Sequence, residues 1–138
     1  MASVEQEGQF IEDERAAIVT IGGEEYQMIL TTRATKEIGK RYGGLENLGE
    51  RLLKEENFEL ALDEIIWLIT LLANQSILVY NLKNKDKPKP VLIEEEVELL
   101  TTPLELASYK VAITAAMFKG TKRNIESEDE GSKNTQAG

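Results

Sequence analysis

Carboxylates are the only side chains in this sequence that are grouped closely enough to suggest metal or acid–base chemistry. Glu94, Glu95 and Glu96 are consecutive, and four more acids lie near the end of the chain: Glu126, Glu128, Asp129 and Glu130. Such oxygen donors could hold a divalent cation. Consecutive helix residues point in different directions, however, and the second group lacks the alternating ligands and the glycine of a calcium loop. We interpret both groups as solvated and predict no metal site.

Other catalytic chemistry is limited by the residue types that are missing. The 138 residues include no cysteine and no histidine. Without them there is no Ser-His-Asp triad, no Cys-His pair and no usual zinc site. We therefore predict no catalytic residue and a protein that is not an enzyme. A carboxylate-based, metal-dependent enzyme remains an alternative, and a melting temperature that rises with Mg²⁺ or Mn²⁺ would favour it.

Two glycine pairs could suggest phosphate binding. Gly22-Gly23 and Gly43-Gly44 both lack the glycine spacing and the Lys-Ser/Thr of a P-loop. A tight turn and a helix end explain them, so we predict no cofactor and no cofactor-binding residue.

Charge and hydropathy limit the partners and the location. With 16 basic and 25 acidic residues the net charge is −9, which argues against nucleic acid. The N-terminus lacks the basic start and apolar run of a secretory signal, so we expect the protein to stay in the cytosol. Residues 65–82 are uncharged and almost long enough to cross a bilayer. Because Asn74-Gln75-Ser76 lies in the middle of this segment, a buried helix fits better than a membrane span.

Turn signals and apolar spacing predict an α+β fold that is mainly helical. Two β-rich segments flank Gly22-Gly23 and predict an N-terminal β-hairpin. About four helices are expected around a long central apolar helix over residues 58–83. The clearest local signal is Thr102-Pro103-Leu104-Glu105, a capping box with proline at the first helical position. The surrounding helices are predicted at residues 33–42, 45–54, 94–100 and 103–119.

The domain organisation follows from these elements. Residues 16–120 are predicted to form a single domain of hairpin and helices. Residues 1–15 are acidic with little to bury, and residues 121–138 are polar, so we predict a flexible arm and a disordered tail.

The central helix carries apolar residues on every side, so it has to be enclosed all round. Either the hairpin and the shorter helices suffice, or some apolar surface is left for another chain. The last helix raises the same question, because few of its positions are polar. Our candidates for contact with a partner come from these two helices: Trp67, Leu71, Val111, Met117 and Phe118.

The order of these elements resembles a known family. Ile18-Val19-Thr20-Ile21-Gly22-Gly23-Glu24-Glu25-Tyr26 is followed by Leu30-Thr31-Thr32-Arg33-Ala34-Thr35-Lys36-Glu37-Ile38, and then by Arg41-Tyr42-Gly43-Gly44-Leu45-Glu46-Asn47-Leu48. This run resembles the start of tail assembly chaperones from long-tailed, siphovirus-type phages and prophages of Gram-positive bacteria. The likeness extends over residues 16–120.

The resemblance implies a chaperone that binds the long, helical tape measure protein, keeps it soluble and yields to tail tube subunits as they polymerise. Such a protein would stay in the host cytoplasm and would not be expected in the mature virion. Homo-oligomers are left open. Family members often have a longer form made by ribosomal frameshifting, and Lys133-Asn134 could be encoded by a slippery site. The main alternative is a small phage regulatory or inhibitory protein that binds a host protein.

Overall fold

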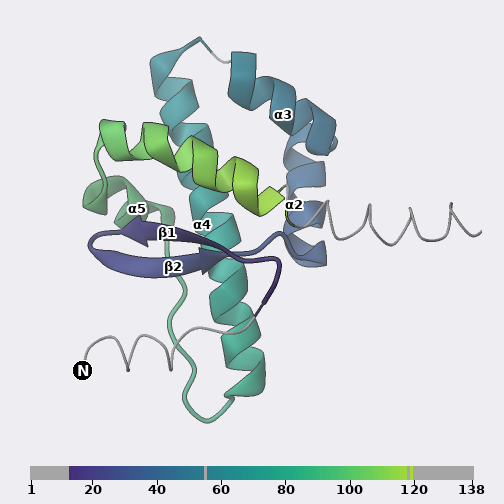
Figure 1. Cartoon of the computed structure of the whole chain (residues 1–138), viewed down its shortest axis with the longest axis vertical. Coiled ribbons are helices and arrows are strands. Elements are labelled where there is room, and N and C mark those ends of the chain that lie inside the picture. Colours follow the sequence, from purple (N-terminus) through teal and green to yellow (C-terminus); the bar gives the residue numbers. More distant parts are fainter. Residues whose placement is uncertain (1–12, 55, 118, 120–138) are drawn as a thin grey trace, which may run out of the picture.

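The structure is a computed structural model that describes residues 13–54, 56–117 and 119. Most of the predicted acidic arm, the whole predicted tail and Lys133-Asn134 lie outside the described residues. Within them the chain forms one two-stranded hairpin and five helices (Figure 1). The predicted fold, a mainly helical α+β arrangement with an N-terminal hairpin and a long central helix, is confirmed.

The hairpin consists of β1 (Ala17–Ile21) and β2 (Glu24–Met28), paired antiparallel with Val19 opposite Tyr26. Gly22 and Gly23 form its turn with φ values of 59° and 84°, a left-handed backbone that favours glycine. Side chains on β1 alternate between buried and exposed, so one face of the hairpin joins the core. The backbone N–H of Ile29, just after β2, donates to the carbonyl of Leu72 in the central helix.

Two short helices follow, α2 (Thr32–Tyr42) and α3 (Leu45–Lys54). The Thr31 hydroxyl caps α2 by accepting a hydrogen bond from the Ala34 N–H at 3.0 Å. Gly43 ends α2 with φ +88°, and its N–H donates to the Gly39 carbonyl. The predicted helix end at Gly43 is thus confirmed.

The central helix α4 (Phe58–Lys83) begins after Asn57, whose side chain caps it by accepting a hydrogen bond from the Leu60 N–H. Leu68, Ile69, Leu72 and Ala73 in its middle are fully buried, whereas Trp67, Leu71 and Asn74 on another side are only half-buried. By length and composition α4 is the one helix of the described chain that could span a membrane, but 56% of its most apolar stretch is buried inside this protein. Burial of that kind is typical of a core helix.

The polar residues of α4 hold neighbouring segments. Asn74 donates to the Leu92 carbonyl at 2.8 Å and accepts from the Leu92 N–H at 2.7 Å. Two turns further along the same face of α4, Asn81 makes the same reciprocal pair with Lys89, at 2.9 and 2.8 Å. These bonds fasten residues 84–93, which we call the return strap, against α4 as the chain turns back (Figure 1).

The strap leads into α5 (Glu94–Leu100) and then into the C-terminal helix at residues 103–117. The predicted capping box is confirmed: the Glu105 carboxylate accepts from the Thr102 N–H at 3.0 Å, and the Thr102 hydroxyl accepts from the Glu105 N–H. The hairpin and the C-terminal helix lie across the same side of α4 (Figure 1). The hydroxyl of Tyr109 joins them by donating to the Thr20 carbonyl.

Candidate interaction surface

Exposed apolar side chains are concentrated in one stretch of the chain. Among the described residues, large apolar side chains are exposed at nine positions, and six of these lie between residues 91 and 111. The exposed fraction reaches 73% at Leu99, 83% at Leu104 and 74% at Val111. We refer to these six exposed side chains together as the 91–111 face: Val91, Ile93, Leu99, Leu100, Leu104 and Val111.

Short length explains why α5 exposes so much. Of its seven residues only Val97 is buried. Leu100 rests against the hairpin turn, since a β-carbon added at Gly22 would lie 3.2 Å from its side chain. Leu99 points elsewhere and remains in solvent. The helix thus packs into the core through Val97, lies against the hairpin turn through Leu100 and presents its other side chains outward.

The C-terminal helix has two distinct faces. Leu106, Tyr109, Ile113 and Ala116 are buried and follow helical spacing. Leu104 and Val111 lie seven residues apart on the opposite side, with exposed Ala107 between them. A helix that packs through one apolar face and carries a second, exposed one has surface to offer to another chain.

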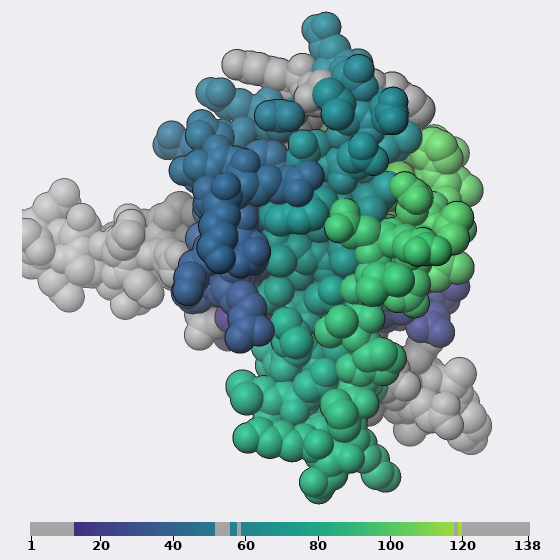
Figure 2. Space-filling view, turned by 180° about the vertical axis from the view of Figure 1, so that it is seen from behind, coloured from purple at the N-terminus to yellow at the C-terminus, as the bar shows by residue number. Residues whose placement is uncertain are grey.

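Leu99 of this face also lines a cleft of about 590 Å³. Figure 2 shows α4 there between α2 and α3 on one side and the segment containing α5 on the other. The cleft is lined by residues from α2, α4 and α5: Arg41, Asp63, Ile66, Glu94, Glu95, Glu98 and Leu99.

The four carboxylates in this lining are not balanced by a neighbouring cation. Within the described part of the chain, Asp63, Glu94, Glu95 and Glu98 have no ion pair. Arg41 is the one cation of the lining, and its charge is directed elsewhere. Its guanidinium carbon lies 4.4 Å from the centre of the Trp67 ring, and its Nε lies 3.7 Å from Glu64. The cleft is therefore acidic.

Glu64, in the second turn of α4, is a buried carboxylate that is only 8% exposed. Arg41 from α2 and Arg51 from α3 approach it at 3.7 Å, longer than a charge-assisted hydrogen bond. Among the described residues, its Oε2 and the buried hydroxyl of Tyr42 have no hydrogen-bond partner. These ion pairs connect α2 and α3 to α4 without satisfying the carboxylate fully.

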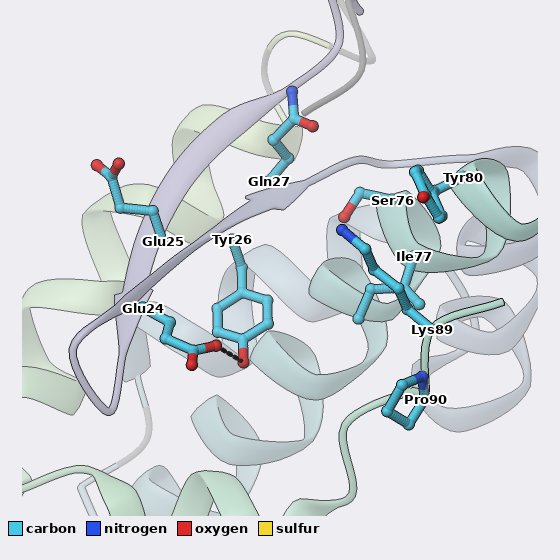
Figure 3. A pocket seen from close by; sticks show the side chains of 9 residues that line it. All are labelled: Glu24, Glu25, Tyr26, Gln27, Ser76, Ile77, Tyr80, Lys89 and Pro90. Atoms are coloured by element: carbon cyan, nitrogen blue, oxygen red, sulfur yellow. Dashed lines mark hydrogen bonds between the residues drawn. The ribbon is translucent and has the colours of Figure 1, made fainter. Parts of the chain in front are cut away.

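A second hollow, of about 290 Å³, lies where the hairpin meets the end of α4 (Figure 3). The Tyr26 hydroxyl donates to Glu24 at 3.2 Å, and the Lys89 ammonium lies 4.4 Å from the centre of the Tyr80 ring. Burial, assisted by Glu24, raises the pKa of Tyr26 to about 12, and burial lowers the pKa of Lys89. The Ser76 hydroxyl donates to the Ala73 carbonyl, so it is held as a helix hydroxyl and not activated as a nucleophile.

The structure places the five predicted contact residues in different settings. Trp67, Leu71 and Met117 are half-buried and pack against the core. Val111 is exposed and belongs to the 91–111 face, whereas Phe118 lies outside the described residues. Sequence reasoning missed Leu99 and Leu104. The seven-residue spacing of Leu104 and Val111, which places both on one helix face, was a signal that could have identified Leu104.

Acidic side chains do not form a metal centre in the described part of the chain. No group of three or more Asp or Glu residues there has the arrangement needed to hold an ion. Glu96 instead caps α5, its carboxylate accepting a hydrogen bond from the Ile93 N–H at 3.0 Å. The predicted cluster at 126–130 lies outside the described residues.

No protein-family model, curated protein or solved structure matches this chain.

Proposed function

We propose that this protein is a phage tail assembly chaperone that binds helices of the tape measure protein and keeps them soluble until the tail tube polymerises. Its contact surface in this proposal is the 91–111 face, and it acts without catalysis in the host cytoplasm. The resemblance of residues 18–48 to the start of such chaperones supports the proposal.

The observation that carries the proposal is the concentration of exposed apolar side chains between residues 91 and 111. Covering a leucine or valine side chain contributes roughly 1.5–3 kcal/mol, so an exposed group of six leaves substantial free energy available for binding. An amphipathic helix could cover them by the helix-in-groove mode of recognition.

Coexpression with the tape measure polypeptide encoded in the same phage gene cluster tests the proposal. We expect the tape measure polypeptide to be soluble with the wild-type chain and to copurify with it. A triple variant of the face, Leu99→Asn, Leu104→Asn and Val111→Asn, should leave it insoluble. These side chains are exposed, so the variant should keep its melting temperature to within a few degrees.

A matched control alters three exposed apolar side chains elsewhere: Ile18→Thr, Leu60→Asn and Leu82→Asn. The control variant should retain the tape measure polypeptide. Purification of the wild-type chain alone, with the tape measure polypeptide insoluble, would rule the proposal out. Recovery of a host protein in place of the tape measure polypeptide would support a phage regulatory or inhibitory protein instead.

A further inference from the structure

We infer that the 91–111 face and the adjoining cleft bind an amphipathic helix whose apolar stripe is flanked by lysine or arginine. This inference rests on the proposed function and specifies the chemistry of the partner segment. It is argued from the apolar side chains that are left uncovered and from the charges that surround them.

The charges within residues 91–111 are almost all of one sign. Residues 91–111 contain five acids and a single base, Lys110. The acids are Glu94, Glu95, Glu96, Glu98 and Glu105. Because Asp63 adds a further carboxylate across the cleft, and Arg41 is held against Trp67 and Glu64, nothing in the cleft lining balances this charge. A partner with basic flanks would supply the balance.

A second copy of the chain would fit this surface poorly. Each molecule has a net charge of −9, and pairing the face with itself would bring two sets of carboxylates together. Like charges at an interface cost free energy and suppress the wrong partner. An acidic or uncharged helix would cover the leucines but leave the carboxylates unbalanced. The combination of apolar and acidic groups therefore favours a basic amphipathic helix.

Two synthetic helical peptides with the same leucine stripe test the inference, one flanked by lysines and the other by glutamates. Binding to the full chain is measured by fluorescence anisotropy of the labelled peptides. We expect the lysine peptide to bind and the glutamate peptide not to bind. Affinity for the lysine peptide should fall as salt rises, since exposed charges are screened over about 8–10 Å at physiological ionic strength.

A matched pair of variants separates the face from net charge alone. The first variant, Glu94→Gln, Glu95→Gln and Glu98→Gln, removes acids of the cleft. The second, Glu46→Gln, Glu50→Gln and Glu59→Gln, removes exposed acids of α3 and α4, including a first-turn acid from each. Each changes the net charge from −9 to −6.

We expect the first variant to bind the lysine peptide about tenfold more weakly than wild type and the second to stay within about twofold. Equal weakening in both variants would overturn the inference, because the attraction would then come from overall charge. Equal affinity of the wild-type chain for the lysine and glutamate peptides would overturn it as well.

Coexpression distinguishes this inference from the proposed function. If the wild-type chain and the first variant solubilise the tape measure polypeptide equally well, the partner does not use these acids; the inference fails while the proposed function stands. If the wild-type chain ignores the tape measure polypeptide but binds the lysine peptide through Glu94, Glu95 and Glu98, the proposed function fails and the partner chemistry stands.

Discussion

Gly22 occupies a position in the hairpin turn where both backbone and space exclude a larger residue. Its φ is +59°, and an added β-carbon would lie 3.2 Å from Leu100. Gly22→Ala is expected to destabilise the protein by about 1–2 kcal/mol, from backbone strain and from pressure on α5. Urea denaturation would measure the loss.

Gly23→Ala provides the comparison for this variant. Its φ of +84° is also left-handed, but no atom lies within 4 Å of the added β-carbon. We expect Gly23→Ala to be the less damaging of the two. If both substitutions lower the free energy of unfolding equally, the contact between the turn and Leu100 contributes nothing to stability.

Glu64 is expected to be dispensable for stability despite its two arginine neighbours. Its ion pairs are long, one of its oxygens has no hydrogen-bond partner among the described residues, and the desolvation of a buried carboxylate is costly. Arg41 and Arg51 are about half exposed, so water can solvate them when the carboxylate is gone. Glu64→Met should leave the free energy of unfolding unchanged or raise it by about 1 kcal/mol.

The urea midpoint of Glu64→Met would be compared with that of Glu50→Met, an exposed position on α3. A loss of more than about 2 kcal/mol at Glu64 alone would contradict this reasoning. It would mean that the two arginines are needed to fasten α2 and α3 to α4.

At the scale of elements, the return strap depends on two asparagines of α4. The strap residues Leu92 and Lys89 have no helix or strand neighbour to pair with their main-chain groups. The side chains of Asn74 and Asn81 take that place, each pairing with both the N–H and the C=O of one strap residue. Asn74→Ala should cost about 1–3 kcal/mol, because Leu92 is buried and its backbone groups would lose their partner.

Asn81→Ala should cost less than Asn74→Ala, since Lys89 is closer to solvent than Leu92. Thermal denaturation of both variants would rank them. If Asn74→Ala also weakens binding of the tape measure polypeptide, the strap positions α5 for that contact. The reverse ranking of stability would show that the outer end of the strap is the one that anchors it.

Local signals explain why so many element boundaries could be predicted. The bounds of α3, α4 and α5 agree with the sequence predictions, because caps and turns such as Asn57 and Gly43 act within a few residues. The pairing of Asn74 with Leu92 could not be predicted, since it joins positions 18 residues apart. From sequence, Asn74 was only a polar interruption in an apolar helix.

The surface was harder to predict than the elements. An apolar helix can be buried or exposed depending on what the rest of the chain places against it, and periodicity does not contain that information. Trp67 was a candidate for partner contact, yet Arg41 and Tyr42 pack on its ring. Leu99 gave no signal at all, because its exposure follows from how α5 packs, with Val97 as its one buried residue.

At the scale of the whole molecule, alkaline pH should lower stability through buried tyrosines. Burial raises the pKa of Tyr26 to about 12 from 10.0, and burial together with Glu105 also raises that of Tyr109. The unfolded chain then loses these protons before the folded chain does. Stability is therefore complete below pH 10 and decreases as pH rises through the folded pKa values.

Urea midpoints measured at several alkaline pH values would check this prediction, with Tyr26→Phe as the comparison. That variant lacks one titrating hydroxyl and should lose stability less steeply than wild type. The lowered pKa of Lys89 has the opposite effect, because the folded chain loses that proton before the unfolded chain does. This effect is the same in the wild-type chain and in Tyr26→Phe, so it cancels in the comparison. Identical slopes for both proteins would show that Tyr26 titrates alike in the folded and unfolded chain.

The return strap has a consequence for the timing of solvent access. Lys89 and Leu92 lie in a segment without helix or strand, where main-chain hydrogens usually exchange rapidly with heavy water. Because their N–H groups donate to asparagine side chains of the central helix, those two hydrogens can be replaced only when the segment lifts away. They should exchange as slowly as helical hydrogens, and their rates would report how often the 91–111 face comes loose from the body that carries it.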